Sequence, residues 1–195
     1  MKYTIIILIG LILCQCTNSP KQSKIKVPID NTFVYWEDLS LPQQESILSL
    51  KSTAKNSIKY YKGIFKISDS NYKELLDSIV NWNDNNLTFY FYIFNDICMK
   101  SDGALSEILS NYCQKTILNN PNYVFNYFKK HNELEKKYTL LLGSELYFKQ
   151  DGTSEMQYNF SELKSILDSK ISKENKTILS DFYMKVEQAI NDMNY

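Results

Sequence analysis

Apolar side chains recur every three to four residues along most of this chain, and this spacing constrains the fold more than any other feature of the sequence. Such a period places the side chains on one face of an α-helix, whereas a half-buried strand would alternate apolar and polar residues. The chain is therefore predicted to be all-α. Seven to eight helices are expected, at about 40–62, 70–82, 87–94, 105–117, 120–128, 134–148, 161–171 and 173–193.

The segment 87–94 (LTFYFYIF) is the most ambiguous of these, because aromatic and β-branched residues suit a buried strand as well as a buried helix. No partner strand is evident elsewhere in the sequence. Since a lone strand cannot satisfy its own backbone hydrogen-bonding groups, we interpret the segment as a helix.

Short corners between the expected helices favour antiparallel helical hairpins packed side by side. The arrangement would be loosely HEAT-like, although no sequence repeat of fixed period is visible. Residues 33–195 have the length of one ordinary domain.

The first residues have the order of parts found in an export signal. Lys2 precedes an apolar run at 4–13, which is too short for a spanning helix of roughly 20 residues. The stretch Leu13-Cys14-Gln15-Cys16 then resembles the lipobox of bacterial lipoproteins. This resemblance implies a signal peptide at 1–15 and a lipidated Cys16, with Cys14 as the alternative. A plain secretory signal with incidental cysteines is the remaining interpretation.

Residues 16–32 are polar at first, contain Pro20 and lack a periodic apolar face, so they are predicted to be a tether between acyl chains and domain. Acyl chains on Cys16 would provide a membrane anchor. In its leader and general composition the chain resembles helical lipoproteins of Bacteroidota-type bacteria. The resemblance implies location in the cell envelope, with the domain in the periplasm or outside the cell, and it transfers no functional residue except Cys16.

Cys98 and Cys113 are the cysteines left after the leader. An exported compartment permits disulfides. If the two residues lie on antiparallel helices joined by a turn at 101–103, Cys98 is next to the turn and Cys113 about three turns away, too far for a bond. Two buried free thiols are therefore expected.

Several kinds of chemistry are disfavoured by the sequence. His131 is the only histidine, so no histidine-based metal site is expected, and the acidic run beside it, with Glu133 and Glu135, is interpreted as a solvated surface. No glycine-rich phosphate loop occurs, and no cofactor is expected. Basic and acidic residues balance at 22 each, all the basic ones being lysine, so no nucleic-acid partner is implied.

Aromatic residues are the positive anomaly, at 14% of the chain with 15 tyrosines. Tyrosine and tryptophan are frequent at recognition surfaces as well as in cores. The candidates are Trp36, Trp82, Tyr90 and Tyr92.

Two functional hypotheses follow. The first is a lipid-anchored, non-catalytic helical module that binds a protein or peptide partner. The second is an anchored enzyme or small-ligand binder that acts on cell-wall material through Asp96 and Asp102, since paired carboxylates can hydrolyse glycosides.

Overall fold

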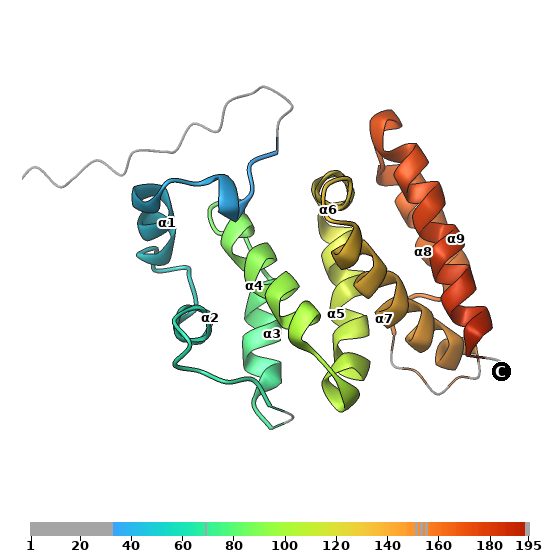
Figure 1. Ribbon diagram of the computed structural model, residues 1–195, viewed down its shortest axis with the longest axis horizontal. Coiled ribbons are helices and arrows are strands. Elements are labelled where there is room, and N and C mark those ends of the chain that lie inside the picture. Colours follow the sequence, from blue (N-terminus) through green and yellow to red (C-terminus); the bar gives the residue numbers. More distant parts are fainter. Residues whose placement is uncertain (1–32, 69, 151, 153, 155, 194–195) are drawn as a thin grey trace, which may run out of the picture. The chain divides into compact units, whose positions relative to one another are not determined.

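A computed structural model describes residues 33–195 except 69, 151, 153, 155, 194 and 195 (Figure 1). The predicted signal peptide, Cys16 and the tether lie outside these residues. The described part is all-α, as predicted, with nine α-helices and two short 3₁₀-helices and no strand. The elements are η1 (Trp36–Asp38), α1 (Leu41–Leu48), α2 (Lys55–Tyr61), α3 (Tyr72–Val80), α4 (Leu87–Lys100), α5 (Gly103–Asn119), α6 (Pro121–Phe128), α7 (Asn132–Gln150), α8 (Phe160–Lys170), η2 (Lys173–Asn175) and α9 (Lys176–Asp192).

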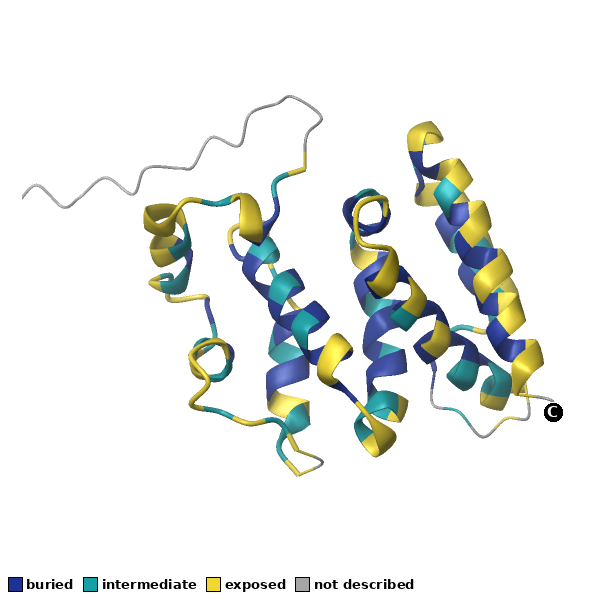
Figure 2. Cartoon of the chain, viewed as in Figure 1, coloured by how far each residue is buried: buried dark blue, intermediate teal, exposed yellow. Residues whose placement is uncertain are grey.

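Residues 33–195 form one compact unit with a continuous apolar core. Consecutive helices from α2 to α7 pack against one another, and α7 packs most extensively, against α5 on one side and α9 on the other (Figure 1). Buried residues follow the helix faces that meet, while α1 and the outer face of α9 are largely exposed (Figure 2). A HEAT-like arrangement stays a prediction.

The helix predicted at 87–94 is confirmed, and it continues as α4 to Lys100. Its aromatic side chains fill the centre of the core, with Phe89, Phe91 and Phe94 at most 2% exposed. Because α4 is covered on most sides, its sequence carries no polar face, and this is why periodicity alone left the segment ambiguous.

The single helix predicted at 40–62 is wrong, because the structure divides this range into α1 and α2. Ala54, just before α2, is extended. Its amide donates a hydrogen bond of 2.7 Å to the Tyr90 hydroxyl, which in turn donates to the Ser52 carbonyl oxygen at 3.2 Å. Tyr90 thereby satisfies backbone groups that a continuous helix would satisfy internally, and this stabilises the break.

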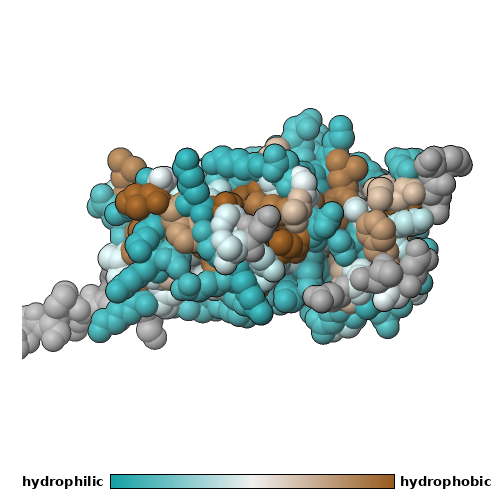
Figure 3. All heavy atoms as spheres, turned by 90° about the horizontal axis from the view of Figure 1, so that it is seen from below, coloured by the Kyte–Doolittle hydropathy of each residue, from teal (hydrophilic) through white to brown (hydrophobic). Residues whose placement is uncertain are grey.

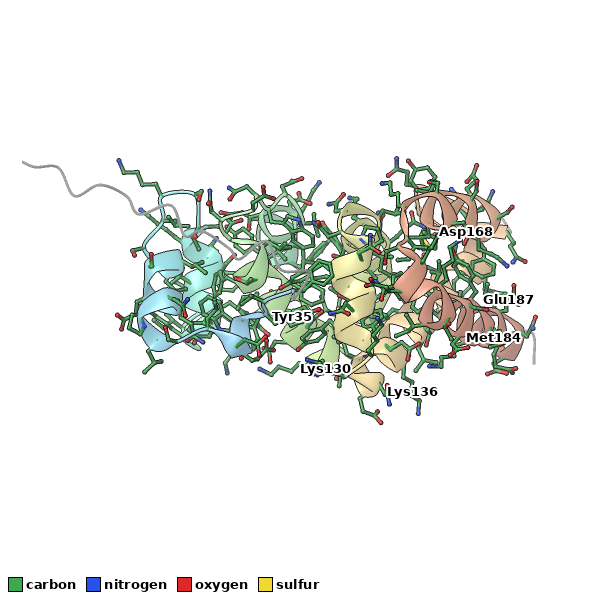
Figure 4. The ribbon with its side chains drawn as sticks, turned by 90° about the horizontal axis from the view of Figure 1, so that it is seen from above. Tyr35, Lys130, Lys136, Asp168, Met184 and Glu187 are labelled. Carbon is green, nitrogen blue, oxygen red and sulfur yellow. The ribbon has the colours of Figure 1, made fainter. Side chains whose placement is uncertain are left out.

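The segment before α1 is fixed to α6 by reciprocal bonds from tyrosine hydroxyls. The Tyr35 hydroxyl donates to the Tyr123 carbonyl oxygen at 3.2 Å, and the Tyr123 hydroxyl donates to the Val34 carbonyl oxygen at 3.0 Å. The Tyr127 hydroxyl donates to Glu37 at 2.8 Å. Tyr35 is consequently 5% exposed where this segment meets α6 (Figure 4).

Glu135 corrects the interpretation of the acidic run beside His131 as a solvated surface. This residue of α7 is 2% exposed, and its Oε2 lies 2.6 Å from the Nζ of Lys185 on α9. A buried carboxylate needs a counter-charge, and Lys185 supplies one across the α7–α9 interface. Glu133 is exposed, as expected.

The cysteines are free and buried, as expected, but the predicted separation is wrong. The Sγ atoms of Cys98 and Cys113 are 3.9 Å apart. Ser101 and Asp102 are both extended rather than folded into a tight turn. An extended residue spans roughly 3.5 Å. The linker therefore carries the start of α5 beyond the end of α4, and Cys98 faces the middle of α5.

Candidate binding surfaces

Three of the six side chains proposed from the sequence lie together where η1, α2 and α4 meet. The ring of Trp36 is 6.2 Å from that of Tyr92 and 5.7 Å from that of Tyr61, and Asp96 follows Tyr92 by one helical turn. Trp36 is 3% exposed and belongs to the core. Tyr61 and the half-buried Tyr92 form the accessible part of this cluster.

The other three candidates lie elsewhere. Tyr90 is 2% exposed and bonds the backbone between α1 and α2. Trp82 is half-buried just after α3 and packs against the core. Asp102 is exposed at the residue preceding α5.

Asp96 is held in a local network. Its Oδ2 accepts hydrogen bonds from the Tyr60 hydroxyl at 2.9 Å and from Nζ of Lys100 at 2.7 Å. Burial, together with the Asp96 charge, raises the pKa of Tyr60. The two concavities described next include neither Asp96 nor Asp102. Neither concavity therefore supports the carboxylate hypothesis for these two residues.

A groove that sequence reasoning missed runs from the loop before α3 across α3 and α5 to α7 and Met156. It consists of two concavities, of about 520 and 440 Å³, that share Lys73 and Asp77. We call this surface the α3–α5 groove. Its charged side chains are Lys73, Glu74, Asp77, Glu107, Lys115 and Glu145.

Hydrogen bonds fix the groove wall. The Tyr112 hydroxyl donates to Asp77 at 2.8 Å, and the Ser154 hydroxyl donates to Glu145 at 2.7 Å. Nζ of Lys115 lies 5.0 Å from the centre of the Tyr112 ring. Burial and the bond to Asp77 raise the pKa of Tyr112. These contacts preorganise the side chains of α3, α5 and α7.

The groove carries an excess of negative charge, with four carboxylates against two ammonium groups. Glu74 and Glu107 are exposed. Asn111 also lines the groove, and its Oδ1 is buried without a hydrogen-bond partner. An unsatisfied buried acceptor costs about 1–3 kcal/mol. The excess of negative charge suits the surface to ligands that bring positive charge.

The sequence contains only a weak signal for this groove. Glu107, Asn111 and Lys115 follow one another at intervals of four and share a face of α5, as on any solvated helix. The groove exists because that face meets α3 and the segment after α7, and helical periodicity does not encode this meeting.

The face seen from below carries apolar side chains in an interrupted band between polar ones (Figure 3). Across the described ranges, no group of three or more metal-ligating side chains comes together. None of the helices in those ranges has the length and apolar character needed to cross a bilayer.

Comparison with protein-family models, curated proteins and solved structures found no match to this chain.

Proposed function

We propose that this protein is a lipid-anchored interaction module of the cell envelope whose α3–α5 groove binds an extended, lysine-containing segment of a partner protein. The observation that carries the proposal is the excess of carboxylates along a groove that spans α3, α5 and α7. Extended peptides suit elongated grooves, where charge complementarity selects the partner and speeds association.

The anchoring part of the proposal rests on the leader, which lies outside the described residues. Cys16 would carry the acyl chains, and the tether would separate them from the segment fixed to α6. In this arrangement the domain faces the aqueous side of the envelope, where a partner with exposed lysines can reach the groove.

Peptide binding tests the groove directly. The full chain in non-ionic detergent is mixed with a fluorescently labelled alternating Lys-Gly peptide, and binding is followed by anisotropy. We expect binding that weakens with added salt, because part of the attraction is between charges. The Glu74→Gln/Glu107→Gln variant should bind about five- to tenfold more weakly, since each partly exposed ion pair contributes up to about 1 kcal/mol.

The matched control is Glu133→Gln/Glu174→Gln, which removes two exposed carboxylates outside the groove and changes the net charge equally. It should bind the peptide like the unmodified chain. Equal weakening in both variants would show that net charge alone attracts the peptide, and it would contradict binding in the groove. Equally tight binding of a Glu-Gly peptide, or no binding of the lysine peptide, would also overturn it.

The anchor is tested separately, by mass spectrometry of the N-terminus after expression in a bacterial host. The mature chain is expected to begin at Cys16 with a diacylglycerol on its sulfur. Cys16→Ser should leave the leader uncleaved, whereas Cys14→Ser should be processed normally. Processing that depends on Cys14 would overturn the choice of Cys16, and an unmodified chain starting at Met1 in the cytosol would overturn the envelope assignment.

A further inference from the structure

Two thiols in the core touch without being bonded. Cys98 lies on α4 and Cys113 on α5, both are fully buried, and their Sγ atoms are 3.9 Å apart. A disulfide requires an S–S separation of about 2.05 Å. The sulfurs belong to neighbouring helices that already pack together, so pairing them does not require the chain to change its fold.

We propose that Cys98 and Cys113 are a disulfide site, which closes when the chain folds in the presence of a disulfide oxidant and then ties α4 to α5. This inference depends on the sulfur geometry alone and is independent of the proposed partner and of the leader.

A small disulfide such as oxidised glutathione can oxidise the two thiols. One thiol loses its proton, attacks the glutathione disulfide and releases one reduced glutathione, which leaves a mixed disulfide. The second thiolate attacks the protein sulfur of that mixed disulfide and releases the other reduced glutathione. The two cysteines together lose two protons and two electrons, and the oxidant takes up both.

Burial determines when this reaction occurs. Neither sulfur is accessible in the folded chain, and burial raises the pKa of Cys113 well above its ordinary value. Attack by the thiolate is therefore slow once the core has closed. We expect oxidation during folding or during local opening of α4 from α5, and the completed bond is then protected from reductants by the same core.

The bond would act on the α3–α5 groove as well as on stability. Helix α3 packs against α4, and the groove lies between α3 and α5. A covalent link between α4 and α5 would limit the separation of the two groove walls. It would also close a loop of 15 residues, which reduces the entropy of the unfolded chain.

The test uses the Cys14→Ser/Cys16→Ser chain, in which Cys98 and Cys113 are the only thiols. It is refolded in non-ionic detergent with oxidised or with reduced glutathione, then denatured and alkylated. After oxidation we expect a monomer lighter by two hydrogen atoms that takes up no alkylating agent. Its helical content should be unchanged, and its unfolding constant should be roughly a hundredfold smaller than that of the reduced chain.

The matched controls are the same chain with Cys98→Ala or Cys113→Ala, in which the remaining thiol should be alkylated or carry one glutathione. Neither control should lose two hydrogen atoms, and the urea midpoint of neither should rise in the oxidising buffer. If the chain that retains both Cys98 and Cys113 showed two alkylated thiols after oxidative refolding, the proposal would be overturned. A bond between two chains, or an oxidised monomer that is less stable than the reduced one, would overturn it as well.

Discussion

Raising the pH from about 9 to about 11 is expected to unfold this chain in one cooperative step, because buried tyrosines must ionise. Seven tyrosines that are at most 8% exposed have a pKa above the ordinary value of 10, chiefly because burial disfavours the phenolate. The pKa of Tyr35 is raised to about 12. The seven are Tyr35, Tyr90, Tyr112, Tyr123, Tyr127, Tyr138 and Tyr183.

Proton linkage explains why stability falls as the pH rises. Each raised pKa contributes stability that is fully present below pH 10, where folded and unfolded tyrosines are both protonated. Above pH 10 the unfolded chain releases protons that the folded chain retains, so stability is lost. For seven groups the loss by pH 11 is at most about 10 kcal/mol, which is comparable with the whole stability of an ordinary domain, about 5–15 kcal/mol.

Circular dichroism and tyrosinate absorbance, recorded along one titration, check this expectation. The tyrosinate absorbance of the seven buried tyrosines should appear over the same narrow pH range in which helix is lost, whereas the urea-unfolded chain should form tyrosinate gradually around pH 10. Tyr127→Phe should reduce the slope of stability against pH by about 1.4 kcal/mol per unit, the contribution of one proton. A chain that stays helical while nearly all of its tyrosines ionise would contradict the prediction.

The same tyrosines show what the sequence could not predict. Their number suggested recognition surfaces, yet most of the hydroxyls bond groups far away in the chain, as Tyr127 bonds Glu37 and Tyr112 bonds Asp77. A tyrosine with such a partner can be buried whole, because its polar end is satisfied. The partner is 35 to 90 residues distant in these examples, so local pattern does not reveal it.

Structural features that depend on residues close together in the sequence were predictable. The all-α class follows from apolar spacing, and Pro121 opens α6 as expected. The division of 40–62 was not predictable, because its cause is the hydroxyl of Tyr90 on another helix. The contact between Cys98 and Cys113 depends on two extended linker residues, and nothing in the composition of that linker distinguishes it from a turn.

The α3–α5 groove could not be predicted for a related reason. Its lining side chains come from α3, α5, α7 and the segments around them, and each is an ordinary polar residue on its own helix. Of the sequence candidates, Trp36, Tyr92 and Asp96 do come together, because η1 and α4 are neighbours. Of these three, Trp36 belongs to the core, whereas Tyr92 and Asp96 are half-buried.

Substituting Gly143 is expected to separate the most closely packed pair of helices. Gly143 lies in α7, and a Cβ atom added there would overlap the Cβ of Ala189 on α9 and would approach the backbone of Ala189 and Ile190 at 3.2 and 3.3 Å. Gly143→Leu should lower stability by about 3 kcal/mol or more, since overpacking commonly costs 1–3 kcal/mol even for smaller additions. Thermal unfolding should move down by roughly 6–12 °C for a chain of this length.

A double-mutant cycle distinguishes close packing from a general effect of changing a glycine. In an exposed helix, Gly143→Ala would stabilise by up to about 1 kcal/mol through helix propensity, but here we expect a net loss because the added methyl meets Ala189. Ala189→Gly removes that methyl contact, so Gly143→Ala should cost less in the Ala189→Gly background than in the original chain. The recovery should be partial, because the backbone atoms of α9 remain close. A gain in stability from Gly143→Ala alone, measured by urea unfolding, would show that α7 and α9 do not approach at this point.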